Sequence, residues 1–246
     1  MTKSDIRQLT FFSDGLRLSG VLHLPGQLPA PFVVGCHGLL SDKESPKQIA
    51  LAEGCNRSGL AYFRFDHRGT GESEGAFSEV TSLNARCRDL LAAVDMLESR
   101  DDTAHLHGLF GSSMGGAVVL AAAGELKPRR LVTLAAPIQS APVVESIRQS
   151  DDPLIHRIPK RFFDKDLTFD ISEKIAGLRH ILIFHGEADT IVPPENARKL
   201  YAACGEPKRL ILLENGDHRI STARNQEIFT RKTVAWFSGK PDDRSI

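Results

Sequence analysis

The chain has 246 residues, of which 41% are hydrophobic and 25% charged, and its 31 basic side chains are balanced by 31 acidic ones. This composition predicts a globular protein with a large core. The balanced charge gives no indication of a nucleic-acid or anionic-membrane partner. The first residues lack the apolar stretch of a secretory signal, and no window is apolar for long enough to cross a bilayer. The four cysteines are scattered without metal-binding spacing, which predicts reduced thiols in a cytoplasmic protein.

Strand-like and helix-like segments alternate along the chain, which predicts one α/β domain over residues 1–246. The first two strands, 6–12 and 16–24, flank Ser13-Asp14-Gly15, whose residues are typical of a hairpin turn. The later strands are short and almost wholly apolar, a pattern typical of strands that are buried on both faces. They are predicted at 32–36, 60–65, 106–110, 130–137, 180–184 and 209–213.

Helices are expected between these strands. The segment 80–99 has leucine and valine residues at a spacing close to 3.6, as an amphipathic helix requires. Pro46 suits the first position of another helix, and Ser221 is expected to cap the last one. The helices with predicted bounds lie at 46–58, 80–99, 194–203 and 221–238.

Residues 138–178 differ from the rest of the chain. Charged residues, prolines and aromatics mix there without a clear period. A structureless loop of this length is improbable inside a compact domain, so we expect short helices within it. We interpret 138–178 as a small lid inserted between strands, with Phe162 and Phe163 lining an apolar substrate pocket.

The most informative stretch is Gly111-Ser112-Ser113-Met114-Gly115, which follows an apolar strand and precedes a segment of small, helix-forming residues. Gly-x-Ser-x-Gly in a strand–turn–helix setting is typical of a nucleophile elbow. Gly111 and Gly115 leave out the Cβ atoms that would block so sharp a turn. The pattern predicts that Ser113 sits at the corner in a strained conformation with its Oγ exposed.

A serine hydroxyl needs a neighbouring base, and the base needs a third group that fixes its tautomer. Asp189 and His218 each follow a predicted buried strand, at the sheet edge where α/β proteins place their sites. The chain order Ser113, Asp189, His218 is the order known for α/β hydrolases. Glu187 is an alternative for the acid, although a solvated loop charge is the simpler interpretation. His185 is expected to pack at the end of its strand.

Together these motifs resemble the α/β-hydrolase superfamily, in particular its bacterial esterase and serine-aminopeptidase-like branch, which includes cinnamoyl and feruloyl esterases. The resemblance extends from the strand end at His37-Gly38 to His218 and covers most of the chain. The motifs that carry it are Cys36-His37-Gly38, Asp66-His67-Arg68-Gly69-Thr70-Gly71-Glu72-Ser73, Gly111 to Gly116, His185 to Pro193, and Gly216-Asp217-His218.

The resemblance implies a mostly parallel central sheet with helices on both faces and a small inserted lid. A nucleophile elbow offers the backbone N–H of Met114 to the oxyanion, and the resemblance implies the N–H of Leu39 as the second donor. It also implies that His37 orients its loop without transferring protons. Asp66 and Arg68 are expected to form internal charge-assisted hydrogen bonds.

The resulting hypothesis is a serine hydrolase that cleaves carboxylic esters through an acyl-enzyme, with a small-molecule ester as its substrate and neither metal nor cofactor. The same catalytic set also suits an amidase or aminopeptidase, a thioesterase or a C–C bond hydrolase. A peptidase needs an anionic group for the substrate ammonium, and the lid offers only scattered candidates. These are Asp151, Asp152, Asp164, Asp166 and Asp170. A binding protein that keeps the fold without turnover is a third alternative, and we expect either a monomer or a homodimer.

Overall fold

The computed structural model describes residues 5–149, 162–163 and 167–240. The described chain contains an eight-stranded sheet in the order β1-β2-β4-β3-β5-β6-β7-β8. β2 pairs antiparallel with both of its neighbours, and the remaining pairs are parallel. The strands are β1 (Asp5–Ser13), β2 (Leu16–Leu24), β3 (Ala30–Cys36), β4 (Ala61–Phe65), β5 (Thr103–Ser112), β6 (Arg130–Leu134), β7 (Ile181–Gly186) and β8 (Lys208–Leu213). The sequence prediction of a mostly parallel sheet is confirmed.

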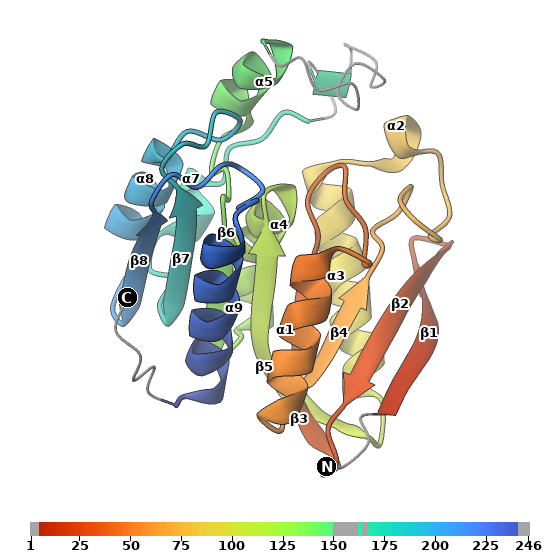
Figure 1. Cartoon of the computed structure of the whole chain (residues 1–246). Coiled ribbons are helices and arrows are strands. Elements are labelled where there is room, and N and C mark those ends of the chain that lie inside the picture. The colour runs from red at the N-terminus through yellow and green to blue at the C-terminus, as the bar shows by residue number, and fades with distance from the viewer. Residues whose placement is uncertain (1–4, 150–161, 164–166, 241–246) are drawn as a thin grey trace.

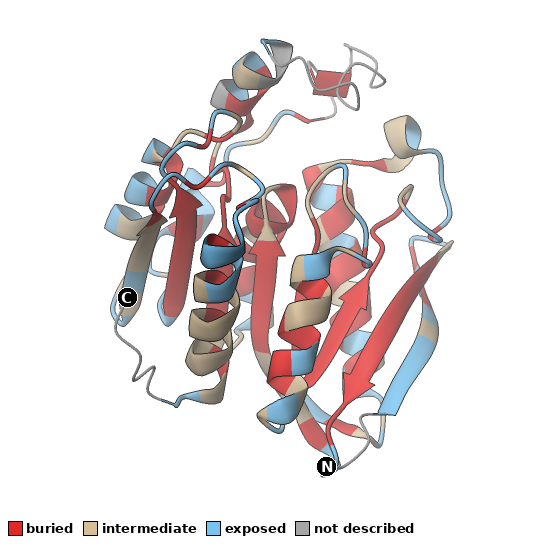
Figure 2. Ribbon diagram, in the orientation of Figure 1, coloured by how far each residue is buried: buried red, intermediate tan, exposed pale blue. Residues whose placement is uncertain are grey.

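Helices cover both faces of the sheet, with α1 and α9 on one face and α3, α4 and α8 on the other (Figure 1). The described helices are α1 (Pro46–Arg57), α2 (Phe77–Val80), α3 (Leu83–Glu98), α4 (Met114–Leu126), α5 (Ser140–Arg148), α7 (Ser172–Ile175), α8 (Glu195–Ala203) and α9 (Ala223–Ser238). Each face has its own apolar core against the strands. The central strands are therefore buried, whereas β1 at the edge is largely exposed (Figure 2).

The predicted hairpin joins β1 to β2, and Ser13 pairs with Leu16 across the turn. Asp14 and Gly15 both have positive φ, at 49° and 81°. This is the backbone twist that two-residue hairpin turns need, and Asp and Gly tolerate it better than other residues. The hairpin therefore follows from local sequence alone.

Two predicted helix boundaries are wrong. The helix predicted at 80–99 begins at Leu83, because Ser82 caps α3 by accepting a hydrogen bond from the N–H of Ala85 at 3.1 Å. Val80 is instead the last residue of α2. The last helix is capped by Thr222, which accepts from the N–H of Asn225. Ser221 instead donates its hydroxyl to Asp217 at 2.6 Å and so belongs to the preceding turn.

Two helices, α5 and α7, lie in the described part of 138–178. An isolated antiparallel bridge joins Gln139 to Asp170. Residues 150–161 and 164–166 are outside the described chain, so the extent of the lid stays a prediction. Helix α5 lies beyond the carboxyl ends of the parallel strands (Figure 1).

Candidate active site

The turn between β5 and α4 has the geometry expected of a nucleophile elbow. Ser113 sits between them with φ 54° and ψ −122°, a positive φ that only a constrained turn imposes on serine. An added Cβ would lie 2.2 Å from the Gly115 carbonyl oxygen if placed at Gly111, and 2.2 Å from that of Cys36 if placed at Gly115. No side chain fits at either position, so glycine is required for α4 to start this close to the sheet.

The three predicted catalytic side chains come together at this turn. His218 Nε2 lies 3.0 Å from Ser113 Oγ, and His218 Nδ1 lies 2.8 Å from Asp189 Oδ2. A carboxylate can only accept hydrogen bonds, so Nδ1 carries the proton and Nε2 is left as the acceptor for the serine hydroxyl. The His218 side chain is 19% exposed, whereas that of Asp189 is fully buried.

Three hydrogen-bond donors and a nearby imidazole nitrogen hold Asp189 in place. Its Oδ1 accepts from the backbone N–H groups of Ile191 and Val192, both at 2.9 Å. Its Oδ2 accepts from His218 and lies 3.2 Å from His185 Nε2. Burial raises the pKa of Asp189, but the hydrogen bonds from His185 and His218 outweigh it and hold that pKa below the usual range. The carboxylate is therefore ionised and fixed in orientation.

His185 lies at the end of β7, as expected, but its contact with Asp189 is not evident from the sequence. Its Nε2 donates to the carbonyl of Val192 at 2.7 Å. Its buried Nδ1 has no hydrogen-bond partner in the described chain. Glu187, the alternative acid, is exposed and lies away from this set of contacts.

The two predicted oxyanion donors flank the serine. Leu39 and Met114 both line the cavity that contains Ser113 and His218. Met114 is the first residue of α4, where a helix leaves its N–H groups without an intrahelical partner. An added Cβ at Gly38 would lie 3.4 Å from Ser113 Cβ, which shows how closely the loop after β3 approaches the elbow.

A buried arginine that we did not predict supports this loop. Arg86 of α3 donates to the carbonyls of Gly38 and Leu39, at 3.3 Å and 3.1 Å. Burial lowers the pKa of Arg86 to about 10, so it is charged at neutral pH. Its position three residues after Leu83 and four before Leu90 places it on the apolar stripe of the helix. A charged residue at an apolar position of an amphipathic helix is the feature of the sequence that could have indicated a buried role for Arg86.

His37 connects the loop after β3 to the loop after β4 through hydrogen bonds. Its Nδ1 lies 2.7 Å from the Gly38 carbonyl, and its Nε2 accepts from the backbone N–H of His67 at 3.1 Å. These partners fix the neutral Nδ1–H tautomer, because a carbonyl only accepts and a backbone amide only donates. Burial, with the nearby charge of Arg86, lowers the pKa of His37 well below its usual value. This geometry supports a positioning role and offers no proton to a substrate.

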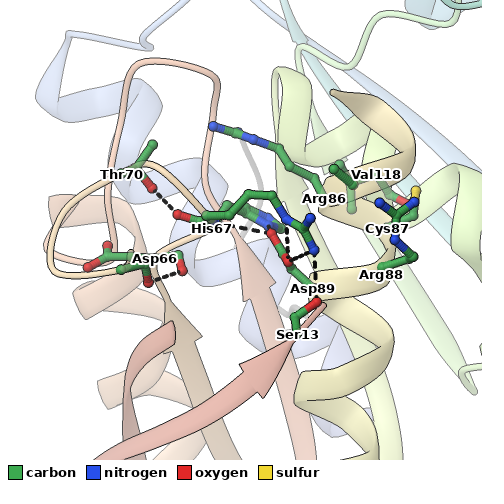
Figure 3. A network of polar contacts seen from close by, with 12 residues as sticks. Ser13, Asp66, His67, Thr70, Arg86, Cys87, Arg88, Asp89 and Val118 are labelled. Carbon is green, nitrogen blue, oxygen red and sulfur yellow. Dashed lines mark hydrogen bonds and ion pairs between the residues drawn. The ribbon is translucent and has the colours of Figure 1, made fainter. Parts of the chain in front are cut away.

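The loop after β4 rests on a fully buried carboxylate. Asp89 of α3 accepts two hydrogen bonds from the Arg68 guanidinium, at 2.9 Å and 2.7 Å, and lies 3.3 Å from His67 Nδ1 (Figure 3). Asp66, nearby, pairs with Lys43 Nζ at 2.7 Å. The internal ionic contacts expected of Asp66 and Arg68 are therefore present, and they are structural.

Ser113 opens into a cavity of about 340 Å³. One part of the cavity wall is apolar and comes from the segment 138–178 and from the loop after β7. Another part is polar and comes from α1, the loop before α1 and the loop before α9. Phe163 lines the cavity as predicted, but Phe162 does not, because its ring packs against Phe77 at 5.3 Å. Among the described residues no carboxylate lines the cavity, and no group of three His, Cys, Asp or Glu could hold a metal ion.

The sequence was compared with known proteins. A family model described as serine aminopeptidase, S33, matches residues 27–168, more than half of the chain. The uncharacterized protein YfhR of Salmonella typhi is 36% identical over 162 residues, covering 63% of this chain and 54% of YfhR. The chain thus spans about half the length of the first curated relatives it matches. The mouse mitochondrial palmitoyl-protein thioesterase ABHD10 is 26% identical over 213 residues, covering 77% of this chain and 69% of ABHD10.

Solved structures with the same fold include esterases. The esterase domain of a Rhodothermus marinus protein has a TM-score of 0.71 at 25% identity, covering 96% of this chain and 98% of that domain. Est1E of Butyrivibrio proteoclasticus, solved with ferulic acid bound, has a TM-score of 0.76 at 22% identity, covering 93% of this chain and 97% of that one. By its fold and the family match, this chain belongs to the serine aminopeptidase (S33) family of α/β hydrolases.

Proposed function

We propose that this protein cleaves carboxylic esters of small molecules through an acyl-enzyme formed on Ser113. The observation that carries the proposal is the chain of hydrogen bonds from Ser113 through His218 to Asp189 at the mouth of a cavity. A nucleophile, a base and a fixed acid in hydrogen-bond contact are the minimum that this chemistry needs.

In the proposed mechanism Ser113 Oγ attacks the ester carbonyl while His218 Nε2 takes the hydroxyl proton. Asp189 stabilises the imidazolium and stays ionised, in keeping with its low pKa. The tetrahedral oxyanion accepts hydrogen bonds from the N–H groups of Leu39 and Met114. His218 then protonates the departing alcohol and activates a water that frees the acyl group.

The support for oxyanion binding is that both donors belong to rigid backbone. Met114 is fixed at the start of α4, and the loop of Leu39 is held from behind by the Arg86 guanidinium. Donors that are oriented before the reaction cost no reorganisation in the transition state, and one such donor is worth about 2.7–4 kcal/mol.

Ser113, His218 and Asp189 can also cleave thioester or amide bonds, and the cavity favours these two alternatives unequally. A thioester is the second candidate, favoured by the similarity to ABHD10 and by the apolar part of the cavity wall. An aminopeptidase is disfavoured, because no described carboxylate lines the cavity to bind a substrate ammonium. Asp170 is exposed and bound to Gln139, and the other acidic candidates in the lid lie outside the described residues.

We also propose that the protein works in the cytoplasm, as a monomer or homodimer, without nucleic-acid or membrane partners. Its four cysteines are free thiols, which suits a reducing compartment. In the described chain no helix combines the length and apolar character needed to span a membrane.

The test is turnover of 4-nitrophenyl butyrate by the wild type and by Ser113→Ala. Loss of a triad nucleophile should lower kcat by a factor of about 10⁴ or more. Thr133→Ala, a buried hydroxyl change away from the cavity, is the control for altered folding. Equal rates for wild type and Ser113→Ala would refute the proposal. Parallel assays with a butyryl thioester and with amino-acid 4-nitroanilides separate the three bond types.

A further inference from the structure

The polar part of the cavity wall, here called the cationic wall, consists of Ser41, Ser45, Lys47, Gln48 and Arg219. It is built where the N-terminus of α1 meets the loop between β8 and α9. Lys47 Nζ donates to the carbonyl of Arg219 at 3.0 Å, which joins the two elements. Two basic side chains from distant parts of the sequence thus face one cavity.

Two side chains of the cationic wall, Lys47 and Gln48, have donors that no described group accepts. An ammonium has three donors, and Lys47 Nζ uses one of them within the described chain. Gln48 is only 2% exposed, and its Oε1 accepts from the Tyr62 hydroxyl at 2.6 Å. Its Nε2 donates to no described group while the side chain lines the cavity. This amide is therefore a donor that a ligand in the cavity can pair with.

The surroundings favour a negative charge at this wall. No described carboxylate lines the cavity. Asp217, next to His218 in the chain, accepts from the N–H and hydroxyl of Ser221, at 2.7 Å and 2.6 Å. Its charge raises the pKa of Lys47, but burial outweighs this effect. The N-terminus of the 12-residue helix α1 adds a partial positive charge. Burial lowers the pKa of Lys47, so its charge lacks part of its hydration and would be stabilised by an anion.

The wall lies beside the group that must protonate the leaving alcohol. His218 acts as general acid only toward an atom within hydrogen-bond reach of its Nε2. Arg219 follows His218 directly, and Lys47 binds the Arg219 carbonyl. We therefore propose that the cationic wall binds a carboxylate or phosphate carried by the leaving group of the substrate. This inference rests on the proposed ester or thioester hydrolysis and adds a substrate class to it.

The kinetic test compares substrates whose leaving groups carry an anion with related neutral substrates. For a carboxylate the pair is 4-acetoxybenzoate and its neutral methyl ester, methyl 4-acetoxybenzoate. For a phosphate it is acetyl-coenzyme A and neutral S-acetyl-N-acetylcysteamine. We expect kcat/KM about tenfold higher for the anionic member of at least one pair, as expected for a charged hydrogen bond. The pair with the larger ratio identifies the source of the anion.

Variants show whether the wall causes the preference. Lys47→Gln with Arg219→Gln should reduce the anionic-to-neutral ratio about tenfold and change the neutral substrate less than about threefold. Lys47→Arg should retain the ratio. Arg57→Gln is the matched control, because it removes an exposed positive charge from the far end of the same helix. An unchanged ratio in the double variant, or an equal loss in Arg57→Gln, would overturn the inference.

A binding measurement keeps the inference separate from the catalytic proposal. Calorimetric titration of the wild type with 4-hydroxybenzoate and with methyl 4-hydroxybenzoate needs no turnover. We expect about tenfold tighter binding of the anion, lost in the double variant. If no ester is hydrolysed but the anion binds preferentially, the proposed function fails and the anion site stands. Equal binding of the two ligands, with ester turnover present and no preference for the anion in either substrate pair, removes the site alone.

Discussion

Two of the histidine–aspartate pairs in the described chain, His218–Asp189 and His67–Asp89, have different settings. His218 and Asp189 are 2.8 Å apart, and the histidine is 19% exposed to the cavity. His67 and Asp89 are 3.3 Å apart, and both side chains are fully buried. Hydrogen bonds hold the pKa of both carboxylates below the usual range, although burial alone would raise each of them.

The two pairs also differ in the other groups that their histidines and aspartates contact. His218 offers Nε2 to Ser113, whereas the Nε2 of His67 has no partner among the described residues. Asp89 is bound by the Arg68 guanidinium, whose charge lies close enough to oppose a proton on His67. Burial lowers the pKa of His67 to about 4. A histidine paired with a carboxylate becomes a base only where a nucleophile and an open cavity face its second nitrogen.

The largest expected effect comes from breaking the cavity pair. His218→Gln removes the base but keeps a side chain of similar size on a partly exposed loop. We expect kcat for 4-nitrophenyl butyrate to fall by a factor of about 10⁴ or more. The melting temperature should fall only modestly, because the buried Asp189 loses the His218 donor but keeps the N–H groups of Ile191 and Val192. Steady-state kinetics with thermal unfolding of the same sample check both, and a kcat within tenfold of wild type would contradict the assignment.

Breaking the buried pair should cost stability instead. Asp89→Asn leaves the Arg68 guanidinium beside a neutral amide in the interior, and loss of one partner of a buried ion pair costs about 3–5 kcal/mol. Urea unfolding should show this loss. The kcat of the fraction that stays folded should remain within about tenfold of wild type. Asp14→Asn, which removes the exposed partner of Arg68, is the matched control and should lose far less. A kcat loss as large as that of His218→Gln would mean that the buried pair takes part in catalysis.

The pH dependence of stability should report the buried pair. The folded pKa of His67, about 4, lies below its ordinary value of 6.5, so the unfolded chain binds more protons between these two pH values. Stability from the neutral ring is complete above pH 6.5 and is lost as the pH falls toward 4. For one such group the unfolding free energy should decrease by about 1.4 kcal/mol per pH unit in this window.

His37 and His23 have pKa values shifted in the same direction and add to this dependence. Urea unfolding at pH 8, 6.5 and 5 gives the slope, and His67→Gln should reduce it. A free energy of unfolding that stays flat from pH 8 to pH 5 would contradict the buried, neutral state of these rings.

Much of the architecture follows from local sequence. The apolar runs of β3, β4 and β7 predict strands buried on both faces, and Gly111 and Gly115 predict the sharp turn at Ser113. The proximity of Ser113, Asp189 and His218 is predictable because parallel strands bring their carboxyl ends to one edge of the sheet.

Contacts between distant elements could not be predicted in this way. The approach of Lys47 to Arg219 joins α1 to the loop before α9, which no local pattern encodes. The contact of His185 with Asp189 depends on how the loop after β7 turns back. Helix periodicity depends on the apolar residues, so it does not predict that Arg86 of α3 binds the loop carbonyls. The course of the segment 138–178 was not predictable, since its residues have no period.

The contact of Arg86 with the Gly38–Leu39 loop separates the support of this loop from the walls of the cavity. The Arg86 guanidinium in the interior holds the carbonyls of Gly38 and Leu39, so the Leu39 amide between them is fixed from the core and not from the cavity. Other parts of the cavity wall come from α1 and from the segment that contributes Phe163. Substitutions in those wall residues should therefore change the shape and charge of the cavity while the Leu39 amide keeps its direction.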